Sequence, residues 1–190
     1  MRIKYNAPTV LTFAIISALA LLLSRTLLPG LIETWFMVSG KGNFNAGNFS
    51  NWVALLSHAA GHANWSHLIN NFTLILLIGP MLEESYGSLS LLLMIIITAV
   101  VTGVLNVLFF RSSLLGASGV VFMMILLASF TNFSHGEIPL TFILVLILYL
   151  GVQLFNSLNS DNISHFAHLV GGFCGSFFGF IRPPRTRRLQ

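Results

Sequence analysis

Six stretches of this sequence are apolar enough to cross a lipid bilayer, and they occupy most of the chain. They lie at residues 9–28, 66–82, 88–110, 116–130, 138–155 and 164–181. A spanning helix needs about 20 residues to cross ~30 Å of hydrocarbon. Hydrophobic residues make up 55% of the 190 residues and charged residues only 7%, which excludes an ordinary soluble domain. The sequence therefore predicts an all-α membrane protein with six transmembrane helices, folded as one polytopic domain over residues 1–190.

The basic residues gather at the two ends of the chain. Six crossings place both ends of the chain on one side of the membrane. That side would hold six basic residues, namely Arg2, Lys4 and the four arginines of the tail 182–190, and the other side would hold three. Because cytoplasmic segments carry the excess of Lys and Arg, both termini are predicted to be cytoplasmic. The tail is interpreted as a topology anchor, and nucleic-acid binding is not expected. The first run also resembles a signal peptide, but no small-residue cleavage site follows it, so we interpret it as a helix.

The longest connection, residues 29–57, is predicted to be a loop that lies in the membrane interface. It is rich in glycine and asparagine, yet it also carries Trp35, Trp52 and several phenylalanines. A solvated linker has no need of those rings, whereas aromatic side chains favour the boundary of the lipid bilayer. The turn between the second and third runs holds Glu83 and Ser88, and Ser88 is expected to cap the helix that follows.

The fourth run is too short to cross the membrane unaided. From Ser118 to Phe130 it covers 13 residues, or about 20 Å at ~1.5 Å per residue, against ~30 Å of hydrocarbon. We therefore expect this helix to begin below the outer surface, after a descending loop, with water above it.

Polar side chains occur at the same depth in three of these helices. With both termini cytoplasmic, the second, fourth and sixth runs all pass from outside to inside. Their first turns hold His67 and Asn71, then Ser118, then His168. A hydroxyl or an imidazole at membrane depth must be hydrogen-bonded, solvated by a cavity or functional, because lipid offers it no partner. We therefore expect these side chains to gather near the outer face.

Ser118 lies in the segment Gly116-Ala117-Ser118-Gly119. One interpretation is a packing site of small residues, which is common between membrane helices. The other is a nucleophile whose neighbours Gly116 and Gly119 lack side chains, so that a peptide carbonyl can reach the serine oxygen and the backbone. The segment alone does not decide between them.

His168 begins a run in which glycine recurs every four residues. Gly171, Gly175 and a further glycine one turn later share one stripe of the helix, where another backbone can approach closely. The fourth run is the expected partner, and that packing would bring His168 toward Ser118. A neutral imidazole can take the serine proton during attack and return it to the leaving amine. The alternative is a histidine bonded to a backbone carbonyl.

The acidic residues lie elsewhere, so a Ser-His dyad is favoured over a Ser-His-Asp triad. The only aspartate, Asp161, belongs to the loop before the sixth run. Phe122, one turn after Ser118, is expected to pack flat against the His168 imidazole and to orient it.

His67 and Asn71 are four residues apart and therefore face the same side of the second helix. Together with the Ser118 backbone N–H they are candidate donors of an oxyanion hole. Polar contacts between helices are the alternative. His58 and His62 are also four residues apart, but no acidic or Cys ligand accompanies them, so we expect structural hydrogen bonds rather than a metal site, and no cofactor.

Four motifs occur in order on these apolar segments. They are His67-x-x-x-Asn71, Glu83-x-x-x-Gly87-Ser88, Gly116-x-Ser118-Gly119 and His168-x-x-Gly171-x-x-x-Gly175. This pattern, over about residues 51–181, resembles the rhomboid family of intramembrane serine proteases. The resemblance implies a six-helix rhomboid-like bundle, Ser118 as nucleophile, His168 as base, and His67 and Asn71 as oxyanion donors. It also implies that the substrates are transmembrane proteins, which reach the site from the lipid beside the helix 138–155.

Three positions depart from the family pattern. Val53 follows Trp52 where an arginine is usual, Ser85 replaces an arginine in the turn after the second helix, and Phe122 replaces a common tyrosine. The rival functions are a non-proteolytic rhomboid-fold protein that binds membrane clients, and a transporter or channel. The first usually lacks the serine or the histidine, and the second predicts charged residues inside the membrane. The short tail is typical of a minimal prokaryotic form, so an inner-membrane location is expected.

Overall fold

The computed structural model describes residues 4–131, 138, 140–151, 163–182 and 184. Within these ranges the chain is helical and contains no strand beyond one isolated bridge. The elements are α1 (Pro8–Thr26), α2 (Leu31–Trp35), α3 (Phe49–Ser57), the 3-10 turn η1 (His58–Ala60), α4 (Trp65–Tyr86), α5 (Ser88–Phe109), α6 (Ser118–Ala128), α7 (Leu140–Val145), the π-helical segment η2 (Leu146–Gly151) and α9 (Ile163–Ile181).

Three helices, α1, α4 and α5, are long and apolar enough to cross a membrane. The helix α6 has 11 residues, and the part of α9 beyond residue 165 is also a shorter apolar helix. The helix α7 and the segment η2 cover part of the fifth predicted run, 138–155, and residues 152–155 lie outside the described residues. The prediction of an all-helical membrane fold is confirmed, whereas the count of six spanning helices is not, because only three helices in the described ranges have full spanning length.

The connection 29–57, predicted as a loop in the membrane interface, contains two helices, α2 and α3. The N-cap of α3 is Asn48, whose side-chain oxygen accepts a hydrogen bond from the Ser50 backbone N–H at 3.0 Å. Phe49 and Trp52 point outward, with 72% and 52% of their surface exposed, while Ala54 on the same helix is fully buried. An apolar outer face is what a helix at the membrane boundary needs.

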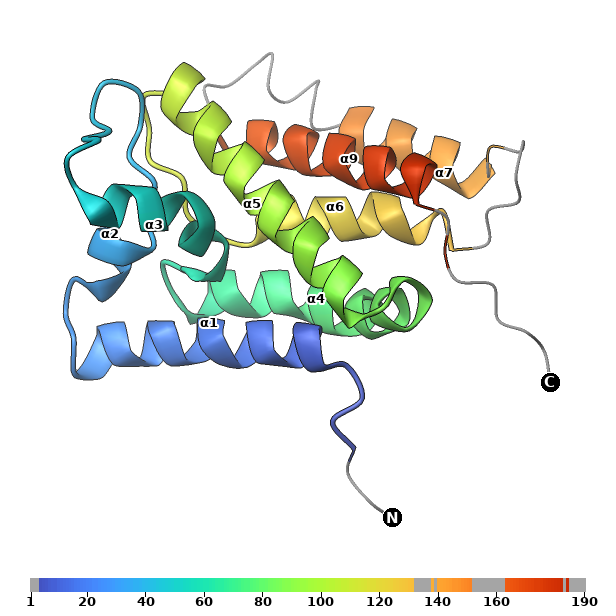
Figure 1. The fold of residues 1–190 in the computed structure, drawn as a ribbon, viewed down its shortest axis with the longest axis horizontal. Coiled ribbons are helices and arrows are strands. Elements are labelled where there is room, and N and C mark those ends of the chain that lie inside the picture. The colour runs from blue at the N-terminus through green and yellow to red at the C-terminus, as the bar shows by residue number, and fades with distance from the viewer. Residues whose placement is uncertain (1–3, 132–137, 139, 152–162, 183, 185–190) are drawn as a thin grey trace.

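The helix α6 is the most enclosed element, and it lies between α4 and α9 (Figure 1). Met123, Met124 and Leu127 have no exposed surface. The long helices around it expose large apolar side chains instead, among them Leu77 on α4 and Phe173 on α9 at 73% and 70%. Because water would not tolerate so continuous an apolar surface, these outer faces suit lipid.

The expectation that Ser88 caps α5 is wrong, since α5 begins at Ser88 and its N-cap is Gly87, with φ at +87°. The acidic residue of this turn, Glu83, instead caps the first helix. Its two carboxylate oxygens accept hydrogen bonds from the backbone N–H groups of Thr9 at 2.8 Å and Val10 at 3.0 Å. A carboxylate at a helix N-terminus satisfies N–H groups that have no partner inside the helix. Glu83 therefore holds α1 against the end of α4.

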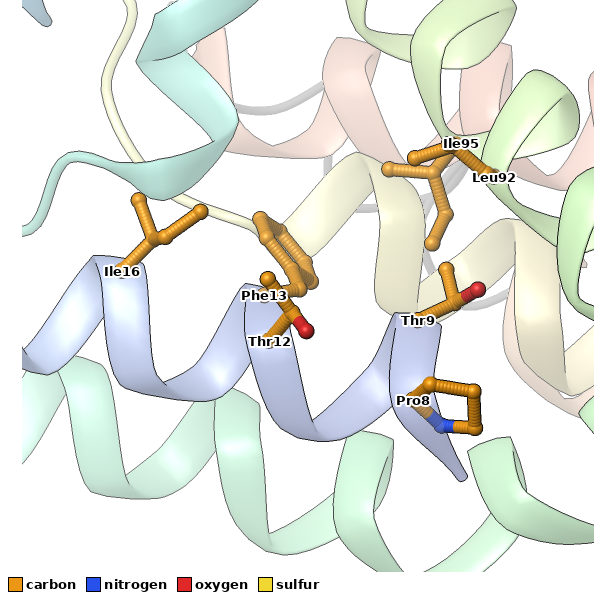
Figure 2. Close-up of a pocket in the computed structure, with 7 residues that line it drawn as sticks. All are labelled: Pro8, Thr9, Thr12, Phe13, Ile16, Leu92 and Ile95. Atoms are coloured by element: carbon orange, nitrogen blue, oxygen red, sulfur yellow. The ribbon is translucent and has the colours of Figure 1, made fainter. Parts of the chain in front are cut away.

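An apolar groove of about 330 Å³ lies between the first half of α1 and α5 (Figure 2). Seven residues line it: Pro8, Thr9, Thr12, Phe13, Ile16, Leu92 and Ile95. No site residue predicted from the sequence is among them, so the groove is separate from the candidate active site.

Candidate active site

The loop that precedes α6 is fixed by backbone hydrogen bonds to two other segments. Val38 and Leu114 exchange N–H···O bonds of 3.0 Å in each direction, and the Gly116 N–H donates to the His58 carbonyl oxygen at 3.0 Å. Gly116 has φ at +115°, in the region that L side chains rarely adopt. These bonds place Ser118 as the first residue of α6, where it is half-buried.

The first turn of α6 presents unpaired backbone donors. Its N-cap, Ala117, makes no side-chain capping bond. The N–H groups of the first residues of a helix have no acceptor within it, and the helix dipole favours negative charge at that end. The N–H of Ser118 is therefore suited to stabilise a negative oxygen.

The helix α9 packs against α6 through glycines. A Cβ on Gly171 would overlap the carbonyl group of Gly119, and one on Gly175 would overlap the carbonyl of Met123. Only glycine permits such backbone contact between two helices. This is the packing that the four-residue glycine spacing predicts.

The contact between these helices brings His168 to the first turns of α6. The His168 ring stacks on the Phe122 ring, with centroids 4.1 Å apart and planes 12° from parallel. One turn earlier on α6, a Cβ on Gly119 would lie 3.2 Å from the carbonyl oxygen of Ala167. Because Ser118 directly precedes Gly119, the serine and His168 belong to adjoining turns of two helices in contact.

His67 and Asn71 reach the same place from α4. The Asn64 side chain caps this helix by accepting from the His67 N–H at 2.8 Å. A Cβ on Gly116 would lie 2.6 Å from His67 Nε2 and 3.7 Å from Asn71 Nδ2. Both side-chain donors therefore lie against the loop residue that stands two positions before Ser118.

Sequence reasoning missed the place of His62 in this cluster. Its Nε2 lies 3.2 Å from Asn71 Nδ2, and its ring centroid lies 5.0 Å from that of His67. His62 lies in the loop before α4, so helical periodicity could not relate it to residues on that helix. His58 lies apart, with Nε2 3.0 Å from the Ala99 carbonyl oxygen, and burial lowers the pKa of His58 to about 4.

Among the residues that the structure describes, no group of three or more His, Cys, Asp or Glu side chains is arranged to hold a metal ion. His62 and His67 lie together, and His62 also contacts the Asn71 amide and the Phe72 ring. The arrangement instead combines a hydroxyl, an imidazole and several N–H donors at one level. Such groups can perform acyl transfer.

Comparisons with known proteins show the family of this chain. The family model described as Rhomboid domain matches residues 50–185, well over half of the chain. The chain is 24% identical to Rhomboid protease GlpG of Haemophilus influenzae over 129 residues, which cover 66% of this chain and 67% of that protein. It is 31% identical to RHOMBOID-like protein 2 of Arabidopsis thaliana, over 68% of this chain and 43% of that protein.

A third relative, Rhomboid-related protein 1 of Caenorhabditis elegans, is 30% identical over 164 residues, which cover 77% of this chain and 42% of that protein. The match thus spans about two thirds of the bacterial relative and less than half of the plant and nematode relatives. Because the Rhomboid domain model matches residues 50–185, which hold most of the helices, this chain belongs to the rhomboid family.

Proposed function

We propose that this protein is an intramembrane serine endopeptidase that cleaves peptide bonds in or near transmembrane segments of other proteins. The observation that carries the proposal is the contact of α9 with α6, in which His168 stacks on Phe122 one turn after Ser118. Membership of the rhomboid family and similarity to a relative named a rhomboid protease support it. No cofactor is part of the proposal.

In the proposed reaction His168 takes the proton of the Ser118 hydroxyl while the serine oxygen attacks the substrate carbonyl carbon. The carbonyl oxygen becomes an oxyanion, which accepts hydrogen bonds from His67, Asn71 and the Ser118 N–H. His168 then gives its proton to the leaving amine as the peptide bond breaks. Water hydrolyses the acyl-enzyme by the same steps, with His168 again as base.

The stack of His168 on Phe122 supports the proposed role of the histidine, because contact with the phenylalanine ring orients the imidazole. A ring held face to face keeps one rotamer at little entropic cost during proton transfer. The tyrosine hydroxyl that Phe122 lacks is not needed for that stacking.

The substrate helix must unwind locally, because a regular helix keeps its carbonyl groups in its own hydrogen bonds. We propose that it reaches the site from the lipid beside α7 and η2. Six crossings with both termini in the cytoplasm complete the proposed topology, with α2 and α3 at the outer interface and the site near that face. The helix α6 has 11 residues, about 16 Å at ~1.5 Å per residue, so its first turn can lie below the headgroups.

Neither rival function is favoured by an observation on this chain. A non-proteolytic relative would not need Ser118 and His168 on helices in contact. A transporter would need charged residues on a path through the bundle, whereas the charged residue buried in the described part of the chain, Glu83, caps α1.

The proposed function is tested with the purified chain in proteoliposomes. A fluorophosphonate probe should label the wild type and the control Ser113→Ala, which changes an exposed serine in the preceding loop, but not Ser118→Ala. Cleavage of a reporter with one transmembrane segment should follow the same pattern, and His168→Ala should abolish it with the fold retained. Cleavage that persists in Ser118→Ala would refute the proposal.

A further inference from the structure

His62 lies beside the proposed oxyanion donors but is not one of them. Its side chain is fully buried in the loop between η1 and α4. The ring meets His67 and Phe72 edge-on, with centroid distances of 5.0 and 5.7 Å, and its Nε2 lies 3.2 Å from Asn71 Nδ2. A buried imidazole that contacts His67 and hydrogen-bonds to Asn71 can control the orientation of both side chains.

Two contacts assign the proton on the His62 ring. The Nδ1 atom lies 3.3 Å from the Ala60 carbonyl oxygen, which can only accept, so Nδ1 carries the hydrogen and donates. Nε2 is then an unprotonated acceptor, and the Asn71 amide nitrogen facing it donates. The two side chains are complementary in this tautomer alone.

We propose that His62 is a positioning residue that holds the Asn71 amide with its NH₂ group toward the oxyanion; this inference rests on the proposed function. An amide nitrogen has two hydrogens, and the bond to His62 uses one and leaves the second for the substrate oxygen. Without an acceptor at this place the amide can turn over. Its carbonyl oxygen would then face the site, where it repels an oxyanion instead of stabilising it.

Protonation of His62 would reverse the pairing, because Nε2–H and the Asn71 NH₂ are both donors. Burial, with a smaller contribution from His67, lowers the pKa of His62 to about 4, so the neutral ring prevails at neutral pH. The other charged groups near this ring are Arg25 of α1 and Glu33 of α2, which line the same cavity of about 320 Å³ as His62. The His62–Asn71 pairing should therefore be lost only in acid.

The test measures kcat and KM of the full chain in proteoliposomes with the transmembrane reporter. His62→Leu should lower kcat by about 10- to 100-fold, somewhat less than the 10²–10³ typical of deleting an oxyanion donor, with KM within about twofold. His62→Gln places an amide oxygen near the position of Nε2 and should restore most of kcat. The matched control is His58→Gln, a buried histidine whose ring bonds Ala99, which should lower stability but not kcat.

A double-mutant cycle separates positioning from structural support. In an Asn71→Ala background, where no amide remains to be oriented, His62→Leu should have no further effect on kcat. Should His62→Leu not fold, His62→Asn carries the test: its shorter side chain should not place an acceptor at Asn71 Nδ2, so kcat should fall where His62→Gln keeps most of it.

Four outcomes count against the inference. If the wild type cleaves the reporter and His62→Leu keeps full kcat, the positioning role is overturned and the proposed function stays intact. Equal losses from His62→Leu with and without Asn71, or no rescue by glutamine, assign His62 a structural role only. A wild type without Ser118-dependent cleavage removes both proposals together.

Discussion

Gly116 shows how one residue without a side chain determines the arrangement of a site. Its φ of +115° turns the chain into α6, and the space where a Cβ would stand lies 2.6 Å from His67 Nε2. Any other residue would strain the backbone and displace a proposed oxyanion donor. The backbone strain and the steric clash with His67 are independent, so substitutions at different glycines can separate their effects.

We expect Gly116→Ala to lower kcat at least 100-fold, because loss of an oxyanion donor typically costs about 10²–10³. The matched control is Gly42→Ala, at φ +86° with open space around it, which carries the backbone strain without the clash. That control should cost about 1–2 kcal/mol of stability and little activity. Reporter cleavage and unfolding in mixed micelles measure both, and equal activity in the two variants would contradict the role of the clash.

His58 makes a separate prediction for stability. Burial lowers the pKa of His58 to about 4 from its ordinary 6.5, so the unfolded chain binds this proton more readily than the folded one. Its contribution is therefore complete above pH 6.5 and is lost as pH falls toward 4. The free energy of unfolding should decrease by up to about 1.4 kcal/mol per pH unit in that window. His58→Gln should reduce this slope, and an unchanged slope would show that His58 does not titrate as described.

At the scale of elements, the contact of α6 with α9 decides whether the site forms. Backbone meets backbone at Gly119 with Gly171 and at Met123 with Gly175, and the same two helices form the aromatic stack of Phe122 with His168. A change at Gly175, about two turns along α9 from His168, should therefore move the imidazole although it touches no reacting atom.

Gly175→Ala tests this coupling, because a single methyl group at this position would overlap the Met123 carbonyl. We expect a loss of about 1–3 kcal/mol in stability from overpacking, and reporter cleavage should fall at least tenfold. Ser176→Ala is the control, since the Ser176 hydroxyl bonds only the Gly172 carbonyl of its own helix. Full activity in Gly175→Ala would show that α9 can shift without moving His168.

At the scale of the whole molecule, the apolar outer surface and the enclosed α6 define a protein built for lipid. The long helices present large apolar side chains outward, while α6 is covered by its neighbours. The proposed orientation, with both termini cytoplasmic, places α2, α3 and the site at the opposite face (Figure 1).

The orientation is tested by labelling in intact cells. The native Cys174 is buried, so it should not react with an impermeant maleimide. Trp52→Cys on α3, where the native side chain is half exposed, should react from outside, and Tyr5→Cys before α1 should react only after the membrane is opened. The reverse pattern would contradict the topology.

Helix positions followed from the sequence because the need to cross a bilayer is local. The prediction of 88–110 meets α5 at Ser88–Phe109, and that of 164–181 meets α9 at Ile163–Ile181. The prediction that His67, Asn71 and Ser118 share one membrane depth used only segment order and direction, and it stays a prediction.

Tertiary structure alone decided the rest, because these features join residues that no periodicity relates. Glu83 caps the first helix through Thr9, which lies 74 residues earlier, and His62 meets Asn71 from a loop outside the helical repeat. The helix α3 escaped prediction because its apolar face turns outward, against the usual burial pattern. By itself the sequence determined which chemical groups are present and which apolar segments carry them, since lipid constrains each helix separately. Their contacts depended on backbone packing between helices, which only the folded chain defines.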